Sequence, residues 1–221
     1  MHNEMMRRPV IKPAVLNFLR EQTTQLTGPL GELEKKAHQD GVPVIPHETV
    51  TFMQTLFNLQ KPQTVLEVGT AIGFSASLFA TCMGPKGRVT SIDRYPLMLE
   101  HAHENIAQLG LEDQITLLAG DAADILPTLT PSYAVIFMDS AKAKYLDFLP
   151  DCLRLLADDG VLLIDDVLQG GTVFDDDATI AHKNKAIHRK LNLLLTQVFS
   201  DTTLVATLLP LGDGVLMITK K

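Results

Sequence analysis

Residues 64–76, TVLEVGTAIGFSA, decide the fold. A short apolar run typical of a buried strand leads into a turn with glycines at Gly69 and Gly73, and helical residues begin near Ser75. A ligand can approach the main chain closely at such a turn, because glycine has no Cβ. The spacing G-x-x-x-G lacks the G-x-G-x-x-G arrangement that cradles a dinucleotide pyrophosphate. We therefore expect either a cofactor other than NAD or FAD at this turn, or a turn that serves packing alone.

The pattern of an apolar run followed by a helical stretch repeats after this segment. Further candidate strands lie at residues 88–93, 115–120, 134–139 and 160–165. Continuous apolar runs separated by helices indicate a parallel sheet with helices on both faces. Two final runs, residues 202–210 and 214–221, are separated only by LGD, which is too short for a parallel crossover. These runs must form an antiparallel hairpin, so the chain is predicted to be an α/β protein with a seven-stranded, mostly parallel sheet.

The segment before the first strand has a helical pattern. Apolar residues recur at helical spacing over residues 14–40, and the pattern resumes over residues 48–59. Pro43 and Pro46 forbid a continuous helix between these stretches. We expect a single domain overall, with an N-terminal helical extension at residues 1–50 and the main domain at residues 51–221.

The composition is that of a globular protein. The chain is 46% hydrophobic and 20% charged, and no apolar run approaches the ~18 residues that a membrane span requires. Its 26 acidic and 19 basic residues give a formal charge of −7, which argues against nonspecific coating of nucleic acid. The N-terminus has no pattern of an export signal, so a cytoplasmic location is expected. Cys82 and Cys152 lie far apart and outside any metal-like spacing, so free thiols are predicted.

Acidic residues follow the second and third strands at positions suited to a nucleotide-like cofactor. Asp93 ends the second strand, where Rossmann-like sheets place the acid that binds both ribose hydroxyls. A cap of the following helix is the alternative. Asp121 and Ala122 follow the third strand, where a carboxylate and a backbone amide could meet adenine. An ordinary N-cap at Asp121 is the alternative there.

Three aspartates follow the fourth and fifth strands. Asp139 ends the fourth strand, and Asp165 and Asp166 end the fifth. The carboxyl ends of parallel strands share one edge of a sheet, so these side chains are expected to converge. A hard cation would relieve their repulsion, and oxygen ligands suit Mg²⁺, Mn²⁺ or Ca²⁺. Capping of the following helices is the alternative for each aspartate.

The motifs VLEVGTAIGFSA, VTSIDRYP, LLAGDA, FMDSAKAKY and LLIDDVLQGG occur in this order, and the chain closes with GDGVLMITKK. Together they resemble the catechol and caffeoyl-coenzyme A O-methyltransferase family over roughly residues 40–221. The resemblance implies the Rossmann-like fold of class I methyltransferases, with S-adenosylmethionine as the methyl donor. It also implies a homodimer. The implied cofactor-binding residues are Glu67, Gly69, Ser75, Asp93, Ala122 and the main chain near Val42 and Asp139, with Asp121 added from its position.

The resemblance also implies which residues carry the chemistry. Lys142 stands where the family keeps its base, beside Asp139, and would take a proton from the acceptor hydroxyl if its neighbours lower its pKa. Lys144 is the rival base. Asp139, Asp165 and Asp166 would bind the divalent metal, although the family commonly has asparagine where this chain has Asp166.

The acceptor is expected to carry two adjacent oxygens. The segments GTAIGFSA, VPVIP and LPLGDGV look more similar to bacterial tRNA 5-hydroxyuridine methyltransferases than to the plant or animal enzymes. Basic residues that could contact tRNA phosphates occur in two groups. These are Lys183, Lys185, His188, Arg189 and Lys190, and, near the N-terminus, Arg7, Arg8, Lys12 and Arg20. The alternatives are a small phenolic acceptor such as a catechol, or a nucleotide-binding module without catalysis.

The acidic stretch FDDDAT at residues 174–179 is predicted to be a flexible, solvated loop.

Overall fold

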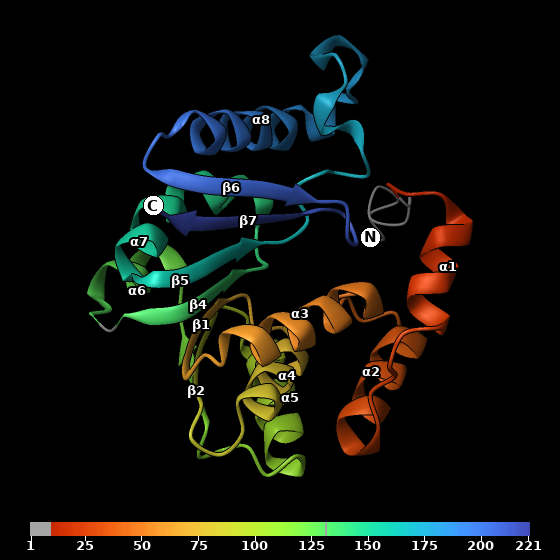
Figure 1. The fold of residues 1–221 in the computed structure, drawn as a ribbon, viewed down its shortest axis with the longest axis vertical. Coiled ribbons are helices and arrows are strands. Elements are labelled where there is room, and N and C mark those ends of the chain that lie inside the picture. Colours follow the sequence, from red (N-terminus) through yellow and green to blue (C-terminus); the bar gives the residue numbers. More distant parts are fainter. Residues whose placement is uncertain (1–9, 131) are drawn as a thin grey trace. The chain divides into compact units, whose positions relative to one another are not determined.

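The computed structural model describes residues 10–130 and 132–221. Its seven strands form one sheet in the order β3-β2-β1-β4-β5-β7-β6 (Figure 1). Parallel pairing joins β1 to β2, β2 to β3 and β4 to β5, whereas β7 is antiparallel to both β5 and β6. The predicted mostly parallel sheet with a C-terminal hairpin is confirmed. The strand bounds are β1 (Thr64–Val68), β2 (Arg88–Asp93), β3 (Ile115–Ala119), β4 (Tyr133–Met138), β5 (Leu156–Ile164), β6 (Leu204–Leu209) and β7 (Val215–Lys220).

Helices alternate with the strands, as the repeated apolar pattern indicates. The α-helices are α1 (Pro13–Glu21), α2 (Gly28–Asp40), α3 (His47–Gln60), α4 (Phe74–Met83), α5 (Pro96–Gln108), α6 (Ala122–Ile125), α7 (Tyr145–Leu155) and α8 (Lys185–Ser200). Short 3₁₀ turns are η2 (Leu126–Thr128), η3 (Lys142–Lys144), η4 (Thr172–Phe174), η5 (Asp177–Thr179) and η6 (His182–Asn184). No helix in the described ranges is long and apolar enough to cross a membrane.

The expected helical prelude consists of two helices. Residues 22–27 separate α1 from α2, and α2 begins with a proline at its first turn, a favourable position for proline. The α2 helix ends at Gly41, whose left-handed backbone (φ 69°) directs the amides of Gly41 and Val42 back to helix carbonyls. The loop through Pro43 and Pro46 then leads into α3, as predicted.

The described residues divide into two compact units, residues 17–129 and residues 130 and 132–221 together with residues 10–16. In the first unit the rings of Phe57 in α3 and Phe79 in α4 stack with their centres 5.2 Å apart. In the second, β4 is almost wholly buried, the part of β5 from Gly160 to Ile164 is buried, and both strands pack with α7. The proposed division near residue 50 stays a prediction.

Both cysteines are free thiols, as expected. Cys152 is buried in α7, where removal from water raises its pKa to about 12. Cys82 is half-buried in α4, and the same cause raises its pKa to about 11. Neither thiol is therefore ionised near neutral pH, which makes both of them weak nucleophiles.

Candidate functional site

The glycine turn of the first unit joins β1 to α4. Gly69 and Gly73 have φ angles of 108° and 79°, and Ala71 between them has a φ of 45°. A Cβ at Gly73 would lie 3.2 Å from the Cβ of Ala102 in α5, so this glycine is also required for helix packing. Close packing therefore explains Gly73, and contact of this turn with a cofactor stays a prediction.

Asp93 holds the glycine turn in place. Its Oδ2 accepts hydrogen bonds from the backbone amides of Thr70 and Ala71, both at 3.0 Å, and its Oδ1 accepts one from the amide of Tyr95 at 2.9 Å. The predicted alternative, a side-chain cap of the next helix, is wrong, because Tyr95 is the N-cap of α5 and no side chain caps that helix. Binding of ribose by Asp93 stays a prediction.

Glu67 lies wholly buried in β1 beneath the turn. The hydroxyls of Ser75 and Ser91 donate to its two carboxylate oxygens, and Ser91 also contacts the hydroxyl of Thr70 at 2.6 Å. Buried carboxylates are stable when hydrogen bonds satisfy them, as here. Glu67 therefore orients Ser75 at the start of α4, and contact of either residue with a cofactor stays a prediction.

Asp121 caps α6. Its Oδ1 accepts a hydrogen bond from the amide of Ala123 at 2.9 Å, and its Oδ2 lies 3.3 Å from Nη1 of Arg94. The N-cap alternative is thus confirmed, while a cofactor contact through Asp121 or the buried Ala122 stays a prediction. The amide of Val42 donates to the carbonyl of Ala37 and is therefore already used inside the protein. The predicted contact of the cofactor with main chain near Val42 stays a prediction.

The acidic residues of the second unit lie at the paired ends of β4 and β5. Met138 pairs with Ile164, so Asp139 and Asp165 follow neighbouring strand ends. Burial, and then the charge of Asp166, raise the pKa of Asp139 to about 7, although Lys142 acts to lower it. Burial and the charges of Asp166 and Asp139 raise the pKa of Asp165 well above its usual range. The charge of Asp166 thus acts on both Asp139 and Asp165, whereas the binding of a metal by the three residues stays a prediction.

Asp166 has an unusual backbone, with a φ of 62°. Its amide donates to Oδ1 of Asp165 at 2.8 Å, which turns the chain sharply after β5. Asparagine and aspartate tolerate this left-handed region better than most residues. This conformational demand suits the aspartate found at this position.

Lys142 lies between two carboxylates. Its Nζ is 3.1 Å from Oδ2 of Asp166 and 3.0 Å from Oδ2 of Asp213, and only 13% of its side chain is exposed. Burial acts to lower the pKa of Lys142, but the charges of Asp166 and Asp213 outweigh it, and the pKa is raised. The condition under which Lys142 would act as the base, namely neighbours that lower its pKa, is therefore not met in this arrangement. The rival Lys144 is 51% exposed and pairs with Asp147 at 3.2 Å, so Lys142 is the better-placed lysine.

The sequence reasoning missed Asp213 and Tyr145. Asp213 lies in the turn between β6 and β7, and its Oδ1 also accepts a hydrogen bond from the amide of Gly170. Tyr145 is fully buried, and burial together with the charges of Asp139, Asp166 and Asp165 raises its pKa well above its usual range. A buried aspartate between two glycines, in the sequence LGDG, is the signal that could have indicated Asp213.

The donor chemistry of this cluster suits a hard cation, but its geometry is not that of an assembled metal centre. Across residues 10–130 and 132–221, no group of three or more His, Cys, Asp or Glu side chains is arranged to hold a metal ion. Lys142 supplies a positive charge beside Asp166. The structure thus brings the predicted aspartates into electrostatic contact without gathering three of them around one point.

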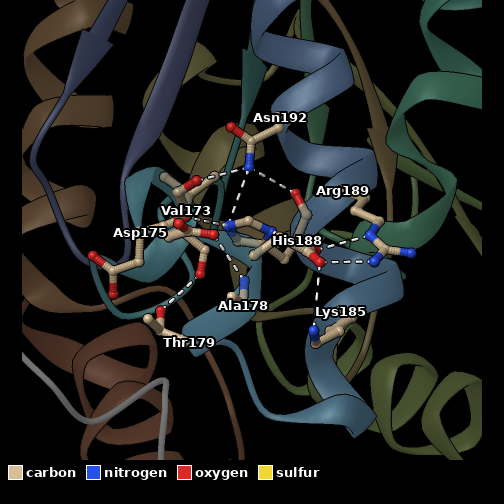
Figure 2. Close-up of polar contacts among 10 residues, drawn as sticks. Val173, Asp175, Ala178, Thr179, Lys185, His188, Arg189 and Asn192 are labelled. Carbon is tan, nitrogen blue, oxygen red and sulfur yellow. Dashed lines mark hydrogen bonds and ion pairs between the residues drawn. The ribbon is translucent and has the colours of Figure 1, made fainter.

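The basic run before and within α8 makes contacts inside the protein (Figure 2). Arg189 binds Asp177 through two nitrogens at 2.8 and 2.7 Å, and Lys185 lies 3.4 Å from the same carboxylate. The nearby His188 is buried, and its Nε2 contacts the carbonyl of Asp175 at 3.1 Å. The acidic stretch 174–179 is mostly exposed, as expected, and it contains the turn η5 and the carboxylate of Asp177 that pairs with Arg189. Its flexibility stays a prediction.

The other basic residues have different surroundings. Lys183 is exposed, and the ammonium of Lys190 contacts the main chain at Ala143. Of the N-terminal group, Lys12 is exposed and Arg20 binds Glu48 through two nitrogens at 2.7 and 2.8 Å. Arg7 and Arg8 lie outside the described residues.

A mostly parallel sheet closed by an antiparallel hairpin, with a glycine turn after β1 and acids after β4 and β5, defines the class of Rossmann-like methyltransferases. The profile of the family described as O-methyltransferase matches residues 12–221. The chain therefore belongs to the O-methyltransferase family.

Individual relatives agree with this assignment. A catechol O-methyltransferase of Niastella koreensis is 31% identical over 162 residues, which cover 72% of this chain and 71% of the relative. "Probable caffeoyl-CoA O-methyltransferase 1" of Dictyostelium discoideum is 28% identical over 215 residues, which cover 94% of this chain and 92% of the relative. Among solved structures, the SAH-bound methyltransferase PaMTH1 of Podospora anserina has a TM-score of 0.84 at 22% identity, with 94% of each chain covered. That structure confirms the fold.

Proposed function

We propose that this enzyme transfers the methyl group of S-adenosylmethionine to a hydroxyl of a small phenol that carries a second oxygen on the adjacent carbon. Relatives named catechol and caffeoyl-CoA O-methyltransferases support this acceptor class. Similar folds include proteins solved with SAH and with SAM, which supports the donor. The single observation that carries the proposal is the buried Lys142, held between Asp166 and Asp213 at the end of β4.

In the proposed reaction, the acceptor oxygen attacks the methyl carbon as the carbon–sulfur bond of the sulfonium breaks. The products are the methyl ether and S-adenosylhomocysteine, and the hydroxyl proton must leave. With its pKa raised, Lys142 stays an ammonium in this arrangement. Its role is therefore to hold the developing negative oxygen. The hydroxyl proton passes to solvent, because the carboxylates of Asp139 and Asp166 are assigned to the metal.

A divalent metal, Mg²⁺ in the first place, is part of the proposal. Asp139, Asp165 and Asp166 are the residues that would hold it, because their oxygen atoms suit a hard cation. When bound, such an ion lowers the pKa of an acceptor hydroxyl. Calorimetric titration with Mg²⁺, Mn²⁺ and Ca²⁺ checks this part directly, and Asp165→Asn is expected to weaken binding.

A tRNA acceptor, favoured by the sequence, has no support from the comparisons. Lys185 and Arg189, two of the side chains expected to contact phosphates, are paired with Asp177, and the ammonium of Lys190 is bonded to the main chain. The small-molecule alternative therefore fits better, and tRNA becomes one outcome of the test. The homodimer stays a proposal, to be measured by analytical ultracentrifugation.

The decisive experiment compares acceptors under identical conditions. Purified enzyme with S-adenosylmethionine and Mg²⁺ is given a 1,2-dihydroxybenzene, the matched 1,3-isomer and tRNA bearing 5-hydroxyuridine. Methylation of the 1,2-isomer alone is expected, and Lys142→Met should lower its kcat by roughly 10²–10³-fold, the usual cost of removing one group that stabilises a developing negative oxygen. Equal rates on both isomers, or methylation of the tRNA alone, would overturn the proposed acceptor class.

A further inference from the structure

Lys190, in α8, makes a contact that is unusual for a lysine on a helix surface. Its ammonium donates a hydrogen bond to the backbone carbonyl of Ala143 at 2.7 Å, although the carboxylate of Asp147 is also near, at 3.7 Å. Lysine ammonium groups are strongly hydrated and usually remain in solvent. A short, charge-assisted bond to a main-chain carbonyl instead fixes a defined point of the backbone.

That point is next to Lys142. Ala143 is the middle residue of η3, which runs from Lys142 to Lys144, and no side chain caps this turn. Its backbone bonds include one from the amide of Lys144 to the carbonyl of Ala141 at 2.7 Å and one from the amide of Tyr145 to the carbonyl of Lys142. The bond from Lys190 therefore attaches η3, a short turn without a side-chain cap, to α8, a helix of 16 residues.

A second contact holds the residues just before η3. The hydroxyl of Tyr145 accepts a hydrogen bond from the amide of Ser140 and donates one to its carbonyl, both at 3.3 Å. Tyr145 and Lys190 thus fasten the loop on either side of Lys142. The side chain of Lys142 is in turn held at its tip by Asp166 and Asp213.

We infer that Lys190 is a positioning residue for Lys142. It anchors η3 to α8, so that the ammonium of Lys142 stays between its two carboxylates during the reaction. The inference rests on the proposed function for its catalytic consequence, but the anchoring itself can be measured separately. Because a misplacement of about 1 Å can lower a rate ~10²-fold, loss of the anchor should reduce kcat without abolishing the fold.

The test compares four proteins. Lys190→Met removes the donor but keeps the chain length, Lys190→Arg keeps a cationic donor, and Lys36→Met removes an exposed lysine from α2 as the matched control. Lys190→Met is expected to lower kcat for the 1,2-dihydroxybenzene by roughly 10–100-fold, with an unchanged KM for S-adenosylmethionine. Lys190→Arg should recover most of the loss, and Lys36→Met should match the wild type.

Hydrogen–deuterium exchange provides a measurement that does not depend on turnover. Amides of residues 140–145 should exchange faster in Lys190→Met than in the wild type, with no change in Lys190→Arg or Lys36→Met. Tyr145→Phe, which removes only the second contact, should accelerate exchange in the same segment. If the wild type methylates no phenol, the proposed function fails, but the exchange result still decides whether Lys190 anchors the loop. Unchanged exchange and unchanged kcat in Lys190→Met would overturn the inference, as would an equal loss in the control.

Discussion

Asp166 has two separate roles, since its backbone adopts a left-handed conformation and its carboxylate acts on the neighbouring aspartates. The φ of 62° requires a residue that tolerates the left-handed region, and the carboxylate raises the pKa values of Asp139 and Asp165. Asparagine can take the first role but not the second. The position therefore allows the conformational role to be separated from the electrostatic one by substitution.

Substitutions at Asp166 should affect stability according to backbone tolerance. Asp166→Asn is expected to change the free energy of unfolding by less than about 0.5 kcal/mol, because asparagine adopts positive φ readily. The β-branched variant Asp166→Val should lose about 1–3 kcal/mol, the usual cost of a disfavoured backbone region. Urea denaturation of both variants measures the difference, and equal stabilities would show that the backbone is not strained there.

Gly73 offers a second test at a single residue. Gly73→Ala places a Cβ at positive φ and 3.2 Å from Ala102, so it should destabilise the protein by about 1–3 kcal/mol. The control is Gly110→Ala, where φ is also positive (66°) but nothing lies within 4 Å of the added Cβ. Urea denaturation should give a larger loss for Gly73→Ala. Equal losses would mean that the backbone angle alone, without crowding, accounts for the effect.

Among the elements, α8 holds several loop segments through its side chains. Asn192 donates to the carbonyl of Val173 at 2.7 Å, His188 contacts the carbonyl of Asp175, and Arg189 binds Asp177. These bonds attach the segment after β5 to one side of the helix (Figure 2). The sequence predicted that these basic residues could contact tRNA phosphates, because sequence spacing does not show that Asp177 pairs with Arg189.

The pairing of Asp177 with Arg189 should make stability depend on pH. Its bonds to Arg189 lower the pKa of Asp177 to about 2, below its value of about 3.9 in an unfolded chain. A carboxylate with a lowered pKa contributes stability above pH 4, and the contribution is lost as the pH falls towards 2. The stability difference between the wild type and Asp177→Asn should therefore be largest near neutral pH and shrink below pH 4.

Chemical denaturation at a series of pH values measures this difference. Asp175→Asn is the matched control, since it removes the same charge two positions away while its backbone carbonyl still accepts from His188. A difference for Asp177→Asn that stays constant down to pH 2 would contradict the assigned pairing.

For the molecule as a whole, the sequence predicts the order of elements better than the contacts between distant residues. The expected strand at residues 64–68 coincides with β1, because Gly69 ends its apolar run. The start of β5 at Leu156 was missed, since the exposed Asp158 and Asp159 suggest a turn, and pairing of Leu156 with Tyr133 extends the strand. The same limit applies to the site, where Asp139 and Lys142 follow from local motifs but their neighbour Asp213 does not.

Cofactor binding should stabilise the whole protein. S-adenosylhomocysteine at about 100 times its Kd is expected to add about 2.7 kcal/mol of stability, which corresponds to a rise in Tm of roughly 5–10 °C for a chain of this size. NAD at the same concentration should leave the Tm unchanged, because the glycine turn lacks the pyrophosphate cradle. Differential scanning fluorimetry compares the two ligands, and a shift with NAD alone would contradict the assigned cofactor class.

The ion pair between Lys142 and Asp213 joins residues 71 positions apart in the chain. Contacts of such long sequence separation form late and slowly in folding, because a long loop must close before they can contribute. A refolding intermediate with its helices and local turns in place would therefore still lack the charged arrangement around Lys142. Recovery of turnover during refolding should lag behind recovery of helical circular dichroism, so activity is the stricter measure of completed folding for this protein.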